Sequence, residues 1–176
     1  MAEDIRGIAG QPIELPLADL FAGPGHTTLA AGELLTAVRL APSAASGGSC
    51  YLRQTVRWSM DLAGVGVAAS VEAEGGVARS ARIALGAVAP VPMLAVDAAA
   101  SVEGTDLAPG TLEEAGALAA AACSPISDAR GTAEYRRQVV AVLTSRALRI
   151  AWLRATGSWP EGVFARPNGV LSEDAL

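Results

Sequence analysis

The chain has 176 residues, of which 51% are hydrophobic and 4% aromatic, and its formal net charge is −5 at pH 7. This length suits one domain of ordinary size, or one domain and a fragment of another. The acidic balance disfavours nucleic acid as a partner, because a basic face supplies most of the affinity in such complexes. The scarcity of aromatic residues also argues against an extended stacking platform for single strands.

Cysteine and histidine are too rare to build a disulfide framework or a metal site. Cys50 and Cys123 are the only cysteines, there is no CxxC motif, and His26 is the only histidine. Two cysteines fit a reduced compartment, and the N-terminal residues do not resemble a signal peptide, so we expect a cytoplasmic protein. No apolar run approaches about 18 residues, so we expect no membrane span.

Residues 1–42 predict irregular structure around short elements. Residues 16–21 predict one helical turn, and a Gly-Pro-Gly sequence at residues 23–25 ends it. Residues 34–40 are apolar and partly alternating, which predicts a strand. This first part of the chain therefore lacks the long periodic segments from which a core is built.

A change in composition marks the expected domain boundary. Small and polar residues run from position 42 to position 49, and we interpret residues 43–49 as a linker. Gly47 and Gly48 are interpreted as turn residues, because their surroundings fit neither the Walker nor the dinucleotide-binding pattern.

The segment after the boundary predicts an antiparallel sheet. Residues 51–57 alternate as a strand does, and residues 62–85 predict a hairpin around the turn residues 74–76. Pro90 and Pro92 are expected to end the pairing, because proline cannot donate to a sheet ladder.

Three helices are expected after the sheet. Residues 94–102 predict a short helix, residues 112–122 a second one with Thr111 as its N-cap, and residues 133–153 a long one. Residues 156–176 lack periodicity and are expected to form a mobile tail. Spacings of three and four place one apolar face on the long helix, made of Tyr135, Val139, Val142, Leu143, Leu148, Ile150 and Ala151. Its arginines are expected to lie mostly off that face, namely Arg136, Arg137, Arg146, Arg149 and Arg154.

Strands followed by helices predict an α+β fold, in which a helical layer covers one antiparallel sheet of about three to four strands. We place this domain at residues 50–155. The composition and periodicity alone do not reveal an active site, since no nucleophile is paired with a base.

Four segments carry a family resemblance, in a specific order and over roughly residues 12–154. They are PLADLFAGPGHTTLAAGELLTAVRLAP (16–42), YLRQTVRWSMDLAGVGVAA (51–69), IALGAVAPVPML (83–94) and SPISDARGTAEYRRQVVAVLTSRAL (124–148). Together they resemble the C-terminal domain of the FAD-carrying medium subunit of molybdenum hydroxylases, the family of carbon monoxide dehydrogenase and bacterial xanthine dehydrogenases. The resemblance implies the same α+β architecture, with residues 1–42 as a remnant of the FAD-binding domain.

The resemblance also implies four residues at the flavin. Arg53 matches a basic family position near the flavin ring, and Arg57 and Asp61 belong to the same pattern, with Asp61 expected to hold one arginine in place. On a strand over residues 51–57, Arg53 and Arg57 would share a face. Leu35 matches a family position that touches the ring. A surface ion pair, and for Leu35 an ordinary core position, are the readings that the residues alone leave open.

The segment before the long helix is expected to have a structural role. Asp128 and Glu134 suit the positive end of the helix macrodipole, and Gly131 permits a tight turn. Arg136 and Arg137 are expected to face either a partner subunit or solvent.

The family's Gly-rich pyrophosphate loops, of the AGGQ and TVGGN types, do not occur in this sequence. The resemblance therefore implies part of a flavin subunit that covers the FAD ring, with a molybdopterin-binding large subunit and a [2Fe–2S] small subunit as partners. A separate N-terminal FAD-binding chain is a further expected partner. A cofactor-free docking module derived from such a subunit is the alternative.

Overall fold

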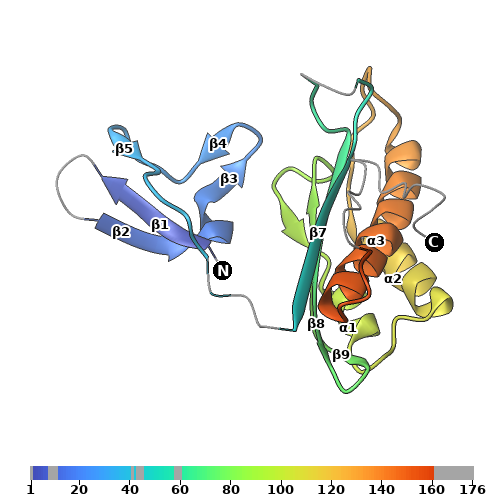
Figure 1. Ribbon diagram of the computed structural model, residues 1–176. Coiled ribbons are helices and arrows are strands. Elements are labelled where there is room, and N and C mark those ends of the chain that lie inside the picture. The colour runs from blue at the N-terminus through green and yellow to red at the C-terminus, as the bar shows by residue number, and fades with distance from the viewer. Residues whose placement is uncertain (1, 8–11, 41, 43–45, 58–60, 161–176) are drawn as a thin grey trace.

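The computed structural model describes residues 2–7, 12–40, 42, 46–57 and 61–160. Figure 1 shows this part of the chain as two units, an N-terminal one up to β6 and a C-terminal one from β7 onward. The N-terminal unit consists mainly of short strands, and the C-terminal unit combines one antiparallel sheet with three helices. Residues 43–45 of the expected linker and residues 161–176 of the expected tail lie outside the described residues.

The N-terminal unit is built around β1 (Ala2–Gly7), which pairs antiparallel with three further strands of the described chain. Those strands are β2 (Pro12–Pro16), β5 (Glu33–Leu34) and β6 (Arg39–Leu40). A 3-10 turn and a small hairpin lie between them, formed by η1 (Leu17–Leu20), β3 (Phe21–Gly23) and β4 (His26–Thr27). The helical turn predicted within residues 16–21 and the break at residues 23–25 are confirmed.

The continuous strand predicted over residues 34–40 is wrong. β5 pairs with residues 6–7 of β1, and β6 pairs with residues 2–3. Only two residues of β1 separate these pairs, whereas four residues, 35–38, separate β5 from β6. The surplus residues cannot all join the ladder, so the segment leaves the sheet and then returns to it.

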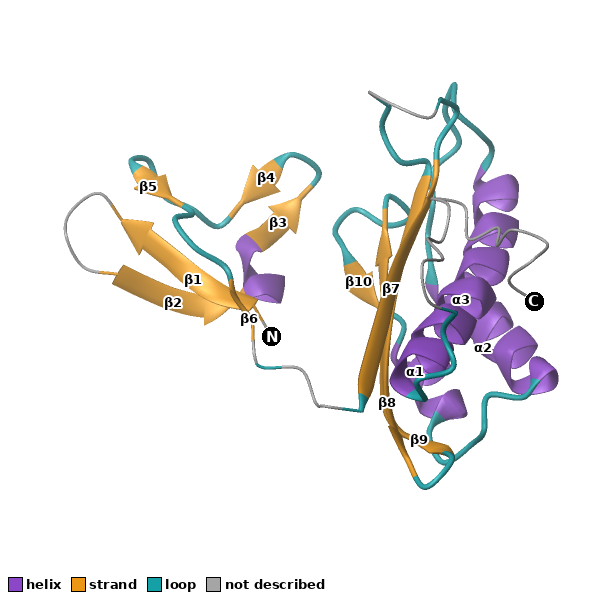
Figure 2. Cartoon of the chain, in the orientation of Figure 1, coloured by secondary structure: helices purple, strands orange, loops and turns teal. Residues whose placement is uncertain are grey.

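The C-terminal sheet has the strand order β10-β9-β8-β7, and each neighbouring pair is antiparallel. Its strands are β7 (Gly47–Gln54), β8 (Val65–Glu74), β9 (Val77–Gly86) and β10 (Met93–Leu94). The helices α1 (Val96–Val102), α2 (Pro109–Ala122) and α3 (Ala133–Ala155) cover one face of it (Figure 2). The predicted α+β class, with a helical layer on an antiparallel sheet, is therefore confirmed.

Alternation along the strands decides which side chains form the core. Leu52, Ile83 and Leu85 are each 1% exposed and belong to one hydrophobic cluster with Val140 and Leu148 of α3. Their strand neighbours project from the opposite face, because successive side chains of a strand point to opposite sides. The helices therefore bury one face of the sheet and leave the other to small and polar residues such as those of β8.

The hairpin and the helices follow the predicted pattern, with differences at their ends. β8 and β9 meet at Gly75 and Gly76, whose φ angles of 61° and 83° suit glycine, as the predicted turn requires. α2 begins earlier than expected, with Ala108 as its N-cap and Pro109 in the first turn, so Thr111 is not the cap. β10 was not predicted, because its two residues become a strand only by pairing with β9.

Gly47 and Gly48 are not turn residues, since they begin β7. A Cβ atom on Gly48 would meet the carbonyl oxygen of Ala151 and lie 2.5 Å from the backbone nitrogen of Ala155. Glycine is needed here because the last turns of α3 pack directly on the strand backbone. The expected linker therefore overlaps the first residues of this strand.

The buried face of α3 begins with a charged residue. Tyr135 and Val142, which we expected on the apolar face, are 44% and 48% exposed. Arg136, which we expected off that face, is only 5% exposed, and Thr144 is fully buried. The buried face is thus rotated relative to the prediction, and Arg136 occupies its first turn.

Candidate functional site

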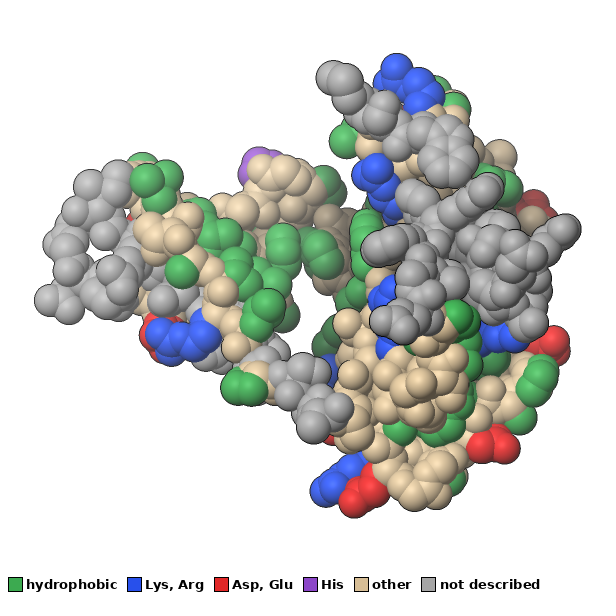
Figure 3. All heavy atoms as spheres, in the orientation of Figure 1, with side chains coloured by type: hydrophobic (Ala, Val, Ile, Leu, Met, Phe, Trp, Pro, Cys, Tyr) green, Lys and Arg blue, Asp and Glu red, His purple; other side chains and the backbone are tan. Residues whose placement is uncertain are grey.

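Several loops meet at one end of the C-terminal sheet. Gln54, the last residue of β7, pairs with Val65, and Gly66 of β8 pairs with Gly86, the last residue of β9. The backbone N–H of Ser124 donates to the carbonyl of Val88, which brings the segment before α3 to the same end. We call this end, formed by residues 55–57, 61–64, 87–92 and 124–132, the loop end. In Figure 3 basic side chains gather at the top of the C-terminal unit, where β7 ends and α3 begins.

Asp61 organises the loop that follows β7. Its Oδ2 accepts hydrogen bonds from the backbone N–H groups of Val56 at 2.9 Å and Arg57 at 2.8 Å, and its Oδ1 accepts one from Leu62 at 2.9 Å. The N–H of Gly64 donates to the carbonyl of Gln54 across the base of this loop. The Arg57 N–H, the largest cause, and the other two N–H groups lower the pKa of Asp61.

The two arginines of the predicted site are held differently. Arg53 lies in β7 opposite Gly66, on the face away from the helices, since its neighbour Leu52 is buried under them. Arg57 lies beyond the end of β7, so the strand alternation from which we expected a shared face does not extend to it. Asp61 was expected to hold one arginine in place. Its contacts at 2.8 and 2.9 Å are with the backbone N–H groups of Arg57 and Val56, so they hold the backbone at Arg57.

Tyr51 lies on the same face of β7 as Arg53, and its ring covers Gly66 of β8. A Cβ atom on Gly66 would lie 2.9 Å from the Tyr51 hydroxyl oxygen and 3.4 Å from the Cε2 atom of its ring. The side chain is nevertheless 61% exposed, so one side of the ring remains open. Tyr51 was not among the predicted site residues, and its alternation with the buried Leu52 was the available signal.

Leu35 is not brought together with the other three predicted site residues. It follows β5 in the N-terminal unit and is 43% exposed, whereas Arg53, Arg57 and Asp61 belong to the C-terminal unit. The elements of the two units are apart in Figure 1. Leu35 is therefore an exposed apolar residue outside the strand that we expected to contain it.

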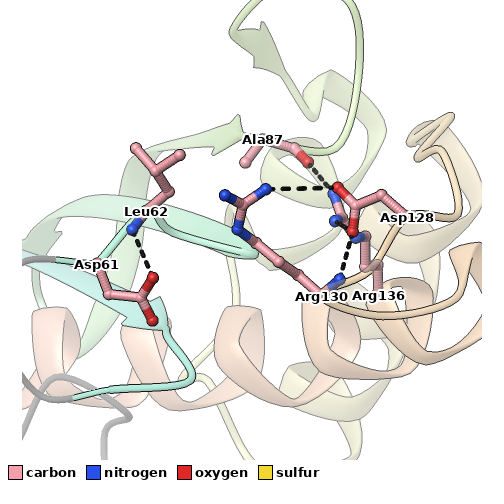
Figure 4. A network of polar contacts seen from close by, with 6 residues as sticks. All are labelled: Asp61, Leu62, Ala87, Asp128, Arg130 and Arg136. Carbon is pink, nitrogen blue, oxygen red and sulfur yellow. Dashed lines mark hydrogen bonds and ion pairs between the residues drawn. The ribbon is translucent and has the colours of Figure 1, made fainter.

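A second polar cluster at the loop end was missed by the sequence analysis (Figure 4). Arg136 donates from Nη2 to Asp128 Oδ1 at 2.6 Å and from Nη1 to the carbonyl of Ala87 at 3.2 Å. Asp128 also accepts a hydrogen bond at 2.8 Å from the N–H of Arg130. This N–H, the largest cause, and the Arg136 side chain lower the pKa of Asp128. The available signal was the helical spacing from Arg136 to the buried Val140.

The described residues offer no metal centre, because they contain no group of three or more His, Cys, Asp or Glu side chains that could hold an ion. Cys50 and Cys123 are unpaired and buried, and burial raises the pKa of both thiols, so neither is an activated nucleophile. Within the same described part of the chain, no helix is long and apolar enough to cross a membrane.

Comparisons with known proteins identify the family to which this chain belongs. A model of the CO dehydrogenase flavoprotein C-terminal domain matches residues 50–151. The carbon monoxide dehydrogenase medium chain of Afipia carboxidovorans is 36% identical over 154 residues, which are 88% of this chain and 53% of that protein. A protein of Escherichia coli named as a putative xanthine dehydrogenase FAD-binding subunit is 26% identical, over 81% of this chain and 49% of its own length.

The fold agrees with a solved structure of the same kind. Reconstituted CO dehydrogenase from Oligotropha carboxidovorans superposes with a TM-score of 0.80 and 34% identity, over 87% of this chain and 53% of that one. The chain thus spans about half the length of the relatives that it matches. Sequence and fold agree, and the chain belongs to the CO dehydrogenase flavoprotein C-terminal domain family, whose members here include medium chains and FAD-binding subunits of oxidoreductases.

Proposed function

We propose that this chain is part of the flavin subunit of a molybdenum hydroxylase-type oxidoreductase and that its loop end covers the ring of FAD. The observation that carries the proposal is the match over most of the chain to medium chains and FAD-binding subunits of such enzymes. In this role the chain takes part in electron transfer from molybdenum and [2Fe–2S] centres to an acceptor.

The residues present fit the ring of FAD better than its pyrophosphate. The loop end and the adjoining end of β7 carry arginine side chains, including Arg53 and Arg57, and a cation beside the ring stabilises negative charge that the ring gains on reduction. A pyrophosphate needs a cradle of backbone N–H groups, and the Gly-rich loops that supply it in the family do not occur in the sequence. We therefore assign only ring-side contacts to this chain.

Each predicted site residue has a distinct task in this proposal. FAD, when bound, accepts and passes on electrons, and Arg53 provides positive charge from the rigid strand β7. Asp61 fixes the backbone at Arg57 through its two contacts of 2.8 and 2.9 Å, so that the Arg57 side chain starts from a defined position. Leu35 contributes apolar contact from the N-terminal unit once the cofactor lies between the two units.

The partners follow from the same proposal. A molybdopterin-binding large subunit and a [2Fe–2S] small subunit would supply the other redox centres, because the described residues contain no cluster of ligands for either. A polypeptide equivalent to the half of the relatives that this chain does not span would supply the pyrophosphate cradle. We expect the assembly in the cytoplasm.

An FAD titration tests the proposal. The chain is purified alone and together with the part of the Afipia carboxidovorans medium chain that it does not span, a preparation that we call the complemented chain. We expect flavin absorbance near one FAD per chain in the complemented chain and little in the chain alone. The absence of bound flavin from both preparations would overturn the proposal and leave a docking module.

A matched pair of variants then locates the cofactor. Arg53→Gln is expected to weaken binding of reduced FAD more than binding of oxidised FAD, because it removes a cation near the ring. Arg79→Gln is the control, since Arg79 forms an exposed ion pair of 2.7 Å with Glu74 at the opposite end of the sheet. Equal behaviour of the two variants would argue against Arg53 at the ring.

A further inference from the structure

The turn before α3 is fixed by reciprocal contacts. The backbone N–H of Asp128 donates to the carbonyl of Gly131 at 3.1 Å, and the N–H of Gly131 donates back at 3.2 Å. Thr132 caps the helix by accepting a hydrogen bond from the N–H of Tyr135 at 3.1 Å. Arg130 lies inside this closed turn, and its own N–H is held at 2.8 Å by the Asp128 carboxylate. The backbone of Arg130 therefore has one defined position.

The Asp128 carboxylate is committed to a different arginine. Its hydrogen bond with Arg136 is 2.6 Å long and charge-assisted, and the Arg136 side chain is only 7% exposed. The guanidinium of Arg130 approaches the same carboxylate at 3.9 Å, and its side chain is 45% exposed. Arg136 and the N–H of Arg130 thus both engage Oδ1 of Asp128. The Arg130 guanidinium lies 3.9 Å from Oδ2, so it is loosely paired and open to a further anionic partner.

Arg130 shares the loop end with the predicted flavin residues. Arg136 joins the turn to the carbonyl of Ala87, which directly follows the end of β9, and β9 is linked through β8 to the end of β7. In Figure 4 the Arg130 guanidinium lies on the side of Asp128 that faces Asp61. The turn therefore presents a cation from the helical layer at the end where Asp61 orders the loop after β7.

We propose that Arg130 is a further flavin-binding residue, which donates hydrogen bonds to the electron-rich oxygen and nitrogen edge of the flavin ring and stabilises the negative charge gained on reduction. This inference rests on the proposed function. Asp128 and Arg136 are positioning residues in it, because they fix the turn from which Arg130 projects and do not touch the ring. Neither the strand nor the loop that carries the predicted site residues contains Arg130.

The test compares affinities for reduced and oxidised FAD in the complemented chain. Arg130→Gln is expected to lower the preference for reduced FAD by about two- to fivefold, the range expected for a partly exposed charge interaction. Arg130→Lys keeps the charge and is expected to restore most of that preference. Arg79→Gln, which removes an exposed arginine at the opposite end of the sheet, should leave the preference unchanged.

The outcomes separate this inference from the proposed function. If the complemented wild-type chain binds no FAD, the proposed function is overturned and the inference falls with it. If wild type binds FAD, Arg53→Gln alters the preference and Arg130→Gln does not, the flavin role stands and the inference about Arg130 is wrong. Thermal unfolding of each variant shows whether a loss of binding reflects a loss of fold.

Discussion

Arg136 shows how one buried side chain connects three parts of the chain. Its guanidinium joins α3 to Asp128 of the preceding turn and to the carbonyl of Ala87, a residue with a φ angle of 63°. A positive φ is costly for alanine, so the hydrogen bond helps to hold the backbone at a position that it would otherwise avoid. The ordered loop end therefore depends on this arginine as well as on the hydrophobic core.

Arg136→Met is expected to lower the free energy of unfolding by roughly 1–3 kcal/mol, because it removes hydrogen bonds from a charged and buried donor. Urea denaturation followed by circular dichroism measures the change. Arg137→Met is the matched control, because its side chain lies on the exposed side of the same helical turn. Equal denaturation midpoints for the two variants would contradict the role given to Arg136.

Stability should fall in acid through Asp61 and Asp128. Their pKa values are lowered in the folded state, chiefly by the N–H of Arg57 and the N–H of Arg130 respectively. A carboxyl group with a lowered folded pKa contributes stability above its unfolded pKa of about 3.9, and this contribution is lost as the pH falls through the folded pKa. We expect Asp128→Asn to unfold more readily than wild type at pH 7 and to show a smaller loss on acidification. Parallel curves of unfolding free energy against pH would refute this.

Helix α3 packs directly on the backbone of strand β7. Gly48 lets the backbone of β7 approach Ala151 and Ala155, and Arg154 donates from Nη1 to the carbonyl of Ser49 at 2.5 Å. These contacts lie at the end of the sheet away from the loop end. They fix the tilt of α3 over the sheet and so the position of its first turn.

Gly48→Ala is expected to destabilise the fold by roughly 1–3 kcal/mol, because the new Cβ atom meets backbone atoms that cannot move without shifting the helix. Gly86→Ala is the control, since a Cβ atom there would meet nothing within 4 Å and the position lies in a strand of the same sheet. Thermal unfolding measures both, and similar melting temperatures would show that the close approach of α3 does not require glycine.

Elements with strong local signals were predictable from the sequence. The glycine turn at Gly75 and Gly76 and the long run of helical periodicity in α3 are local signals. Each predicts its element without knowledge of distant residues. β10 and the interruption between β5 and β6 arise from pairing with distant strands, which a single sequence does not reveal. Gly48 looked like a turn residue because the sequence does not show which helix will pack against it.

The candidate site was predictable only in part, for the same reason. The resemblance selected Arg53, Arg57 and Asp61. The structure shows that the Asp61 carboxylate accepts hydrogen bonds from the backbone of the loop after β7. The cluster around Asp128 and Arg136 depends on the contact with Ala87, which is 49 residues away from Arg136 in the sequence. Residue types and spacing within the segment before α3 suggested only a charged helix start.

At the scale of the whole molecule, the described chain combines a unit of one sheet and three helices with a smaller strand unit that exposes apolar side chains. In the N-terminal unit, Leu34, Val38 and Leu40 are 58%, 49% and 75% exposed. The relatives contain about as much sequence again as this chain spans. In the proposed function, the cofactor lies where the two units meet a further polypeptide, with the loop end on the ring side.

Hydrogen exchange of the complemented chain, with and without FAD, tests this placement most directly. We expect FAD to slow exchange at residues 51–57, 61–64 and 124–132 and to leave the hairpin turn at residues 74–77 unchanged. Slowed exchange confined to residues outside the loop end and the adjoining part of β7, or no change in a preparation that contains bound FAD, would contradict it.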